Sequence, residues 1–515
     1  MQDRKYIFGL SSVTLVIILG AVVKFAMHMY IAPGYGFFGD ELYTIALSKH
    51  LAFGYVDLPP LVPVLVALSR ALLGESLFAM HIVPALAGSA TLVFVCLIAK
   101  EFGGKAFAVL LSAIGFIFVP LWLSLDSIFC YDSIDQLVLA GFLYTLVRFL
   151  RSGNKRLWIL LGLIAGVACM TKMTILFLGP GFLAALLVSK YRKDLLTPWP
   201  WLGAALCVVV VSPYLFWQIA NHWPTLEYWN NYGTLRVYQA SIPQYLTNVL
   251  AYMNPFFLPL WIAGLYRIFR RLNGVNYGFL GVLFLVTLVL EFILHASTRM
   301  IGELFVPLIA AGAVFVEEKL DGIRWEIGLK TATTLYLLVT GVYILPSSLP
   351  ILPLDRFQSF YGDTGKPLYQ SVKEFNGAPS YYPLLLSGRI GWEKITQDVA
   401  GVYDKLPAQD RAMVGIYADF WMDAGAIDLL GPQNGLPHAV SGSLTYYLWG
   451  PGYSWDVMII ISTKTNPLAV FFDKCEFQAT AQRGFDAPSG PISIFVCRKP
   501  KISADKIWSS LKSYR

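Results

Sequence analysis

Residues 77–100 read LFAMHIVPALAGSATLVFVCLIAK, a stretch in which Lys100 is the only Lys, Arg, Asp or Glu. A helix that crosses a bilayer needs about 20 consecutive apolar residues, so this stretch is long enough to span a membrane. Similar apolar runs occupy residues 6–27, 105–125, 134–150, 157–171, 173–189, 198–219, 253–267, 276–295, 302–316 and 331–347. The sequence therefore predicts a polytopic α-helical membrane protein with about eleven spans.

The overall composition agrees with lipid as the solvent of much of the chain. Of the 515 residues, 56% are hydrophobic and 14% are charged, whereas soluble proteins are about 45–50% apolar and about 25% charged. The formal net charge is +7, but the basic residues lie in short clusters between apolar runs, as topology signals do. We therefore expect membrane lipids as partners, and no nucleic acid.

Basic residues mark one side of the predicted membrane domain. Cytoplasmic loops carry an excess of Lys and Arg, and alternate connections contain Lys100 and Lys105; Arg151, Lys155 and Arg156; Lys190, Arg192 and Lys193; Arg267, Arg270 and Arg271; and Lys319, Arg324 and Lys330. Residues 28–76, 126–133, 220–252, 296–301 and everything after about 348 are predicted to face the other side. The first run lacks a small-residue cleavage site, so we interpret it as a retained span.

Two segments outside the spans have structure of their own. In residues 28–76, the stretches Glu41–Phe53 and Pro60–Leu73 are apolar but too short or too polar to span, so we predict helices along the membrane surface. After Pro346–Pro353, a domain-sized unit begins. It is predicted to be a soluble α/β domain, with strands at Ala412–Ala418, Val457–Ser462 and Ile492–Arg498 and a helix at Trp421–Leu430.

We therefore divide the chain into a transmembrane domain, 1–347, which includes the surface helices, and a soluble domain, 348–515. Cys475 and Cys497 both fall in the outer domain, where an oxidising compartment would allow a disulfide; a bridge and two free thiols both remain open. The other four cysteines lie in or beside spans, where cysteine serves as a small apolar residue.

Three carboxylates lie in the first outer segment, at Asp40 and Glu41 after Gly39 and at Asp57 before Pro59-Pro60. Carboxylates at the mouth of a helix bundle can act as general bases. Adjacent helical positions point about 100° apart, so Asp40 and Glu41 cannot aim at one atom if both are helical. A Gly-Asp pair before an apolar helix also fits a helix N-cap, and this alternative does not exclude catalysis.

A second group of charges lies in the later outer connections. Asp126, Asp132 and Asp135 precede or begin a span, where acidic residues are costly to bury and indicate a site, unless they are solvated at the interface. Lys172 and Arg299 are cations on the side that the basic clusters avoid. Each is a candidate ligand for a phosphate. The alternative is a side chain that only extends its charged end to the membrane interface.

Aromatic residues fill the third outer connection, around His222-Trp223-Pro224 and Tyr228–Tyr232. Aromatic belts at membrane interfaces account for such residues, and stacking on a sugar is the alternative. The histidines show no compact ligand spacing, so we predict no metal site.

Taken in order, these motifs resemble glycosyltransferase family 39 of the GT-C superfamily, which includes protein mannosyltransferases and lipid A aminoarabinose transferases. The resemblance covers essentially the whole membrane part and rests on Gly39-Asp40-Glu41, Gly54–Leu61, Asp135-Gln136-Leu137, Thr171-Lys172, Pro213–Gln218 and His222–Leu226. Ala424–Asp428 and Tyr447–Pro451 are similar to the outer domain of bacterial members. No cofactor is implied.

The resemblance implies an inverting transfer of a sugar from a polyprenyl-phosphate donor to a lipid, glycan or protein acceptor on the outer side. Asp40 would be the general base, and Glu41 would orient the base or the acceptor. Lys172 and Arg299 would hold the lipid phosphate, on which negative charge develops. Asp135, or Asp132 by a shifted match, would bind acceptor or sugar hydroxyls; Asp57 and His222 complete the substrate-binding candidates.

Two positions depart from the family pattern. Aminoarabinose transferases carry a lysine directly before the double proline, where this chain has Leu58, and Met300–Leu304 replaces a tyrosine-rich stretch near Arg299. The phosphate is therefore expected to be held differently, and the sugar is not identified.

Two other classes of protein, a transporter and an assembly factor, are alternatives to a glycosyltransferase. A transporter or flippase of lipid-linked glycans would favour charges within spans and related halves, and no such halves are found. A membrane assembly factor leaves Gly39-Asp40-Glu41 unexplained. We expect a multi-pass enzyme of the inner (plasma) membrane with its C-terminal domain in the periplasm.

Overall fold

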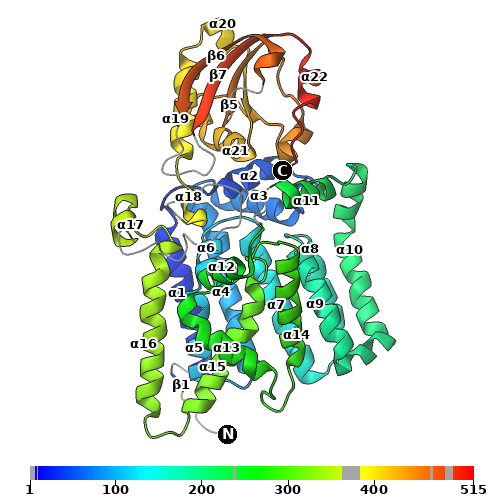
Figure 1. The fold of residues 1–515 in the computed structure, drawn as a ribbon, viewed down its shortest axis with the longest axis vertical. Coiled ribbons are helices and arrows are strands. Elements are labelled where there is room, and N and C mark those ends of the chain that lie inside the picture. The colour runs from blue at the N-terminus through cyan, green and yellow to red at the C-terminus, as the bar shows by residue number, and fades with distance from the viewer. Residues whose placement is uncertain are drawn as a thin grey trace. The chain divides into compact units, whose positions relative to one another are not determined.

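The computed structural model describes residues 6–7, 10–235, 239–361, 383–463, 468–481 and 491–514 (Figure 1). The chain folds into two compact units. The helical unit comprises Met1–Gly34, Phe78–Leu215 and Tyr238–Glu374; the mixed unit comprises Tyr35–Leu77, Phe216–Val237 and Phe375–Arg515. The mixed unit thus joins the first outer segment to the C-terminal residues. The division after residue 347 was made from hydropathy, and it stays a prediction about where the membrane part ends.

The helical unit is built from apolar helices joined by short turns. Its helices are α1 (Ser12–Ile31), α4 (Leu77–Glu101), α5 (Ala106–Ile117), α6 (Pro120–Leu125), α7 (Tyr131–Ser152), α8 (Leu157–Cys169), α9 (Thr174–Val188), η1 (Lys190–Leu196), the greater part of α10 (Pro198–Ala220), α12 (Ile242–Tyr252), η2 (Pro255–Phe257), α13 (Leu258–Ile268), α14 (Gly278–Ile293), η3 (Gly302–Leu304), α15 (Phe305–Leu320), α16 (Glu326–Ile344), η4 (Leu345–Ser347) and α17 (Leu354–Tyr361).

Several of these helices can cross a membrane. Among the described residues, α1, α4, α7, α10 and α16 extended to Ser347 are five helices long and apolar enough to do so. The number rises to seven if α9 with η1, and α12 with η2 and α13, are each one bent span. The helices α5, α8 and α14 are apolar but shorter. The chain is therefore a mostly helical protein with transmembrane helices, and the count of about eleven is not confirmed.

Two of the predicted spans are interrupted. Within 105–125, α5 ends at Ile117 and α6 begins at Pro120. Proline cannot donate a helical hydrogen bond, but its fixed φ suits the first position of a new helix. Near the start of 253–267, Asn254 has φ 62° and its side chain accepts the Phe256 N–H at 3.1 Å, which begins a new turn. Both breaks arise from the local backbone conformation, so the mean hydropathy of the segment does not reveal them.

Glycine sets the distance between α13 and α15. A Cβ atom at Gly264 would lie 1.7 Å from the carbonyl oxygen of Leu308, and one at Gly312 would lie 1.9 Å from that of Leu260. In lipid, helices associate through close packing of small residues, because apolar side chains gain little by leaving lipid. The two glycines therefore allow the backbones to touch.

The mixed unit combines helices with a small sheet. Its elements are α2 (Gly39–Lys49), α3 (Leu61–Leu73), α11 (Pro224–Leu235), α18 (Leu384–Ser387), α19 (Trp392–Asp404), α20 (Ala408–Arg411), β3 (Val414–Ala418), α21 (Trp421–Leu430), η6 (Pro432–Asn434), β4 (Ala439–Val440), η7 (Leu444–Trp449), β5 (Val457–Ser462), η8 (Ala469–Phe471), β6 (Phe472–Ala481), β7 (Ile492–Pro500) and α22 (Ala504–Ser509).

The sheet has the strand order β4-β3-β5-β7-β6 and is coloured orange to red in Figure 1. β3 runs parallel to β4 and β5, and β7 is antiparallel to β5 and β6. Every residue of β5 is buried, as expected for a central strand covered on both faces. β5 and α21 have the predicted bounds, and β3 and β7 overlap predicted strands. β6 was not predicted, because this edge strand is largely exposed and polar.

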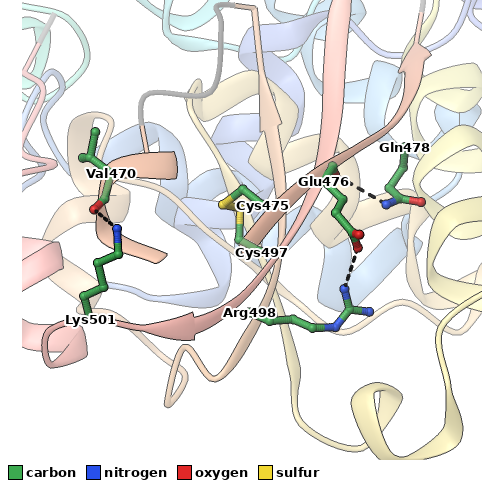
Figure 2. Close-up of a disulfide and its surroundings, with 7 residues drawn as sticks. All are labelled: Val470, Cys475, Glu476, Gln478, Cys497, Arg498 and Lys501. Carbon is green, nitrogen blue, oxygen red and sulfur yellow. Dashed lines mark hydrogen bonds and ion pairs between the residues drawn. A yellow bond between two sulfur atoms is a disulfide. The ribbon is translucent and has the colours of Figure 1, made fainter. Parts of the chain in front are cut away.

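A disulfide joins Cys475 of β6 to Cys497 of β7 (Figure 2). The two residues are directly paired across the antiparallel strands. Next to them, Arg498 donates to Glu476 at 3.3 Å and to Asp410 at 2.8 Å. The sequence left open whether Cys475 and Cys497 are bridged, and the structure contains the bridge. The disulfide attaches β6, an edge strand with one neighbour in the sheet, to β7.

Replacing Cys475 with Ser is expected to lower the free energy of unfolding by about 3 kcal/mol, because the bridge closes a loop between residues 22 positions apart. Unfolding of the purified protein followed with temperature or denaturant measures the change. Cys207→Ser is the matched control, since Cys207 is a free thiol. Equal stability of both variants, or alkylation of Cys475 without prior reduction, would contradict the bridge.

Candidate functional site

Asp40 and Glu41 lie in the first turn of α2, in the mixed unit. The N-cap is Phe38, with φ −76° and ψ 148°, and not Asp40. Glu41 is fully buried, and its Oε2 accepts the N–H of Phe38 at 2.8 Å. Glu41 is therefore the residue that caps the helix, since it satisfies an N–H that has no partner within α2. Asp40 is partly exposed one position earlier.

Asp57 is joined to α2 through Tyr43. The Tyr43 hydroxyl donates to Asp57 Oδ1 at 2.7 Å. Burial raises the pKa of Asp57 to about 7, the Tyr43 hydrogen bond opposes the rise, and the negative charge of Asp40 adds to it. Asp40 and Asp57 are therefore close enough to interact electrostatically. The structure brings Asp40 and Asp57 close together as partly exposed groups, whereas the third carboxylate of the first segment, Glu41, caps the helix.

The loop that carries Asp57 is held from two sides. The carbonyl oxygen of Tyr55 accepts hydrogen bonds from Gln218 Nε2 and Thr225 Oγ1, both at 3.4 Å. The N–H of Val56 donates to Thr445 Oγ1 at 3.0 Å. These partners come from the end of α10, the start of α11 and η7. Residues far apart in the sequence therefore fix the backbone on the N-terminal side of Asp57.

His222 lies in the turn between α10 and α11, where its φ is 61°. Trp223 follows with φ 58°. Positive φ is uncommon for residues with a side chain and marks a constrained turn. Among the described residues, no hydrogen bond or ion pair links His222 to Asp40, Glu41 or Asp57. A role of His222 with substrate stays a prediction.

The helical unit holds the second group of site residues. Lys172, in the turn between α8 and α9, forms an ion pair with Asp132 of α7. Its Nζ also lies 5.3 Å from the ring centroid of Tyr131. The neighbouring Thr171 hydroxyl donates to Asp135 Oδ1 at 2.7 Å. Because Asp132 and Asp135 are three positions apart, they share one face of α7. The adjacent residues Thr171 and Lys172, in the turn between α8 and α9, therefore bind both.

Arg299 and Glu303 belong to the same group of charges. The charge of Arg299 acts on Lys172, and Arg299 Nε donates to Ser297 Oγ at 3.2 Å. Glu303 of η3 is buried and interacts electrostatically with Asp135, Asp132 and Lys172. Sequence reasoning did not choose Glu303. An acidic residue at the start of the predicted span 302–316 is the signal that could have found it.

Asp126 has a different partner from the other acidic residues of its loop. It forms an ion pair with Lys24 of α1 at 2.6 Å, and neither side chain is exposed. Gln136 Nε2 donates to its Oδ1 at 3.0 Å. A Cβ atom at Gly88 would lie 2.3 Å from the carboxyl carbon, so only glycine leaves room for it. Asp126 therefore links α1, α4 and α7, and it fixes α7 at the residue that follows Asp135.

Metal binding finds no support in these groups. Among the residues that the structure describes, no set of three His, Cys, Asp or Glu side chains is arranged to hold a metal ion. That the reaction needs no metal stays a prediction.

A family model described as dolichyl-phosphate-mannose-protein mannosyltransferase matches residues 57–217. This range contains Asp57, Asp132, Asp135 and Lys172, and it ends before His222 and Arg299. No curated protein matches the chain.

Several solved structures have a fold similar to that of this chain. ArnT from Cupriavidus metallidurans in the apo state is 14% identical, with a TM-score of 0.57 over 94% of this chain and 98% of that chain. The same protein bound to undecaprenyl phosphate is 14% identical, with a TM-score of 0.55 over 94% and 97%. Arabinofuranosyltransferase AftD from Mycobacteria is 13% identical, with a TM-score of 0.50 over 93% and 41%. The fold is therefore ArnT-like.

Replacing Lys24 with Met is expected to reduce the free energy of unfolding by about 3–5 kcal/mol, because Asp126 would be left as a buried charge without its cation. Adding Asp126→Asn should restore part of the loss, since the two costs are coupled. Denaturant or thermal unfolding in detergent measures both.

The matched control is Lys394→Met, which breaks the exposed pair with Asp398 on α19. It is expected to cost less than about 1 kcal/mol. If the Lys24 and Asp126 variants were simply additive, the buried pair would have no coupling and the proposed link between α1 and α7 would be wrong.

Proposed function

We propose that this membrane protein, whose residues 57–217 match the dolichyl-phosphate-mannose-protein mannosyltransferase family model and whose fold is ArnT-like, is an inverting glycosyltransferase. It transfers a sugar from a polyprenyl-phosphate-linked donor to an acceptor on the periplasmic side of the inner membrane. The observation that carries the proposal is the group formed by Lys172, Asp132, Asp135 and Arg299 around the start of α7. The undecaprenyl phosphate bound to ArnT in one solved relative supports this class of donor.

The mixture of charges in this group suits a sugar phosphate. Lys172 and Arg299 are the cations that would bind the phosphate oxygens, which arginine and lysine hold through charge-assisted hydrogen bonds. Asp132 and Asp135 are acceptors for sugar hydroxyls. A donor with an anionic phosphate and a hydroxyl-rich ring offers a partner for each kind of side chain.

In the reaction, the acceptor hydroxyl loses its proton to the Asp40 carboxylate while its oxygen bonds to the anomeric carbon. The bond between that carbon and the phosphate oxygen breaks, and the electron pair leaves with the polyprenyl phosphate. Attack opposite the leaving group inverts the configuration at the carbon. Lys172 and Arg299 stabilise the charge that develops on the phosphate, a term that is commonly the largest in such catalysis.

The other first-segment residues support Asp40 in different ways. Glu41 caps α2, so we assign it the role of fixing the helix start from which Asp40 projects, in place of direct contact with the acceptor. Asp57 is hydrogen-bonded to Tyr43 and interacts with Asp40, and we propose that it binds substrate hydroxyls. His222 is retained as a candidate for stacking on the sugar.

The transporter alternative makes a different use of charge. It favours ionisable groups within spans, and Lys24 of α1 is such a group. Lys24 is fully buried and paired with Asp126, however, so its charge has a partner within the helical unit. The glycosyltransferase proposal accounts for the partly exposed Lys172 and Asp40 as well.

Asp40→Asn is expected to lower turnover of the donor by about 100-fold to 10,000-fold, because a nearly isosteric amide cannot accept the acceptor's proton. The measurement is sugar release from a panel of radiolabelled polyprenyl-phosphate sugars by membranes that contain the protein. Asp398→Asn, at a partly exposed position of α19, is the matched control and should keep full activity. Unchanged turnover by Asp40→Asn would show that another group is the base, and no turnover by a folded wild type would favour the transporter.

Lys172→Gln is expected to weaken donor binding and to slow the chemical step by about 10-fold to 100-fold, since one charge on the leaving phosphate loses its partner. Binding of the polyprenyl phosphate without its sugar separates the first effect from the second. Lys394→Gln is the control for loss of an exposed lysine. Donor affinity and turnover equal to the wild type would contradict the phosphate assignment.

A further inference from the structure

The segment that carries the first-loop carboxylates is packed against the C-terminal residues of the mixed unit. α2 lies along α21, and a Cβ atom at Gly425 of α21 would come 2.9 Å from the carbonyl carbon of Leu42 and 3.1 Å from the nitrogen of Tyr43. The two helices therefore touch backbone to backbone. At this distance, α21 fixes the position of the part of α2 that bears Tyr43.

Tyr43 is buried within this contact, and its hydroxyl forms two hydrogen bonds. Its side chain is 1% exposed, and its ring lies 4.9 Å from that of Trp421 and 6.2 Å from that of Tyr446. Its hydroxyl accepts the N–H of Thr445 at 3.2 Å and donates to Asp57 Oδ1 at 2.7 Å. The direction of the Tyr43 hydroxyl bond is therefore set by the C-terminal backbone.

The C-terminal side of this contact is anchored in turn. The Tyr446 hydroxyl donates to Asp428 Oδ2 at 2.7 Å, and Asp428 Oδ1 accepts the N–H of Ala439 at 2.7 Å. Ala439 begins β4, so the sheet and α21 hold η7 in place. Next to Tyr446, Thr445 Oγ1 accepts the N–H of Val56, the residue before Asp57.

From this geometry we infer that the C-terminal residues of the mixed unit are part of the catalytic apparatus, with Tyr43 and Thr445 as positioning residues that hold the Asp57 carboxylate. The inference rests on the proposed function, in which Asp57 binds substrate hydroxyls. Thr445 acts at two points: its N–H orients the Tyr43 hydroxyl, and its hydroxyl fixes the backbone that precedes Asp57. The C-terminal sheet then contributes to transfer without touching the substrate.

The state of Asp57 gives this role a measurable signature. Burial raises the pKa of Asp57 to about 7, and the Tyr43 hydrogen bond favours the charged form and limits the rise. Ionised Asp57 is present above that pKa and lost as the pH falls through it. Removing the Tyr43 hydroxyl should therefore raise the pKa further, and the acid limb of the activity profile should move to higher pH.

The experiment compares Tyr43→Phe, Thr445→Val and Thr445→Ser with the wild type. Two quantities are followed against pH: the infrared band of the protonated Asp57 carboxyl, identified by its loss in Asp57→Asn, and donor turnover. Tyr43→Phe is expected to move both midpoints up by about one pH unit. Thr445→Val should shift them the same way by less, and Thr445→Ser should restore them, because serine keeps the acceptor for the Val56 N–H.

The matched control is Tyr453→Phe, which removes a hydroxyl that donates to the carbonyl oxygen of His438 at 2.7 Å in the same unit. It should leave both midpoints unchanged. Midpoints that stay at the wild-type pH in Tyr43→Phe and Thr445→Val, with both variants folded, would overturn the positioning role. A shifted infrared band in a protein whose wild type turns over no donor would instead overturn the proposed function.

Discussion

The helical unit depends on compensating charges that lie among apolar helices. A charge taken out of water is costly, and it is retained only where an opposite charge and hydrogen bonds replace the lost solvent. The pair of Lys24 and Asp126 meets this condition with both side chains fully buried, and Gln136 completes it. The pair ties α1 to the start of α7, and the residue before Gln136 is Asp135, which Thr171 binds. The ion pair thus fixes the position next to Asp135, a residue of the candidate phosphate site.

In the mixed unit, buried polar groups are satisfied by hydrogen bonds between segments that are distant in the sequence. Residues 35–77 are too short to form a core alone, and they bury α2 against α21 and η7. At this contact the Thr445 N–H donates to the Tyr43 hydroxyl, which in turn donates to Asp57. A buried hydroxyl without partners would be destabilising, so packing and polar satisfaction favour the same arrangement. The role of the C-terminal residues follows from this shared core.

Much of the candidate site could be predicted from the sequence, because charged residues are rare in apolar surroundings and indicate a functional or structural role. Asp132, Asp135, Lys172 and Arg299 were chosen on that ground, and the structure gathers them around one end of α7. Glu303 was passed over, since a single glutamate at the start of a predicted span resembles an interfacial residue. The separation of Glu41 as a cap from Asp40 required coordinates, because hydrogen bonding to the N–H of Phe38 depends on where the helix begins.

The sequence by itself determined the apolar helices, the α/β character of the C-terminal residues and the bounds of β5 and α21, because burial in lipid or in a sheet imposes a periodic pattern that each segment carries alone. It also predicted which residues could act on a sugar phosphate. Tertiary structure decided that residues 35–77 share a compact unit with residues 375–515, that Cys475 and Cys497 are bridged, and that Thr445 reaches Tyr43. These facts join positions separated along the chain, and local pattern holds no information about which distant partner a side chain will meet.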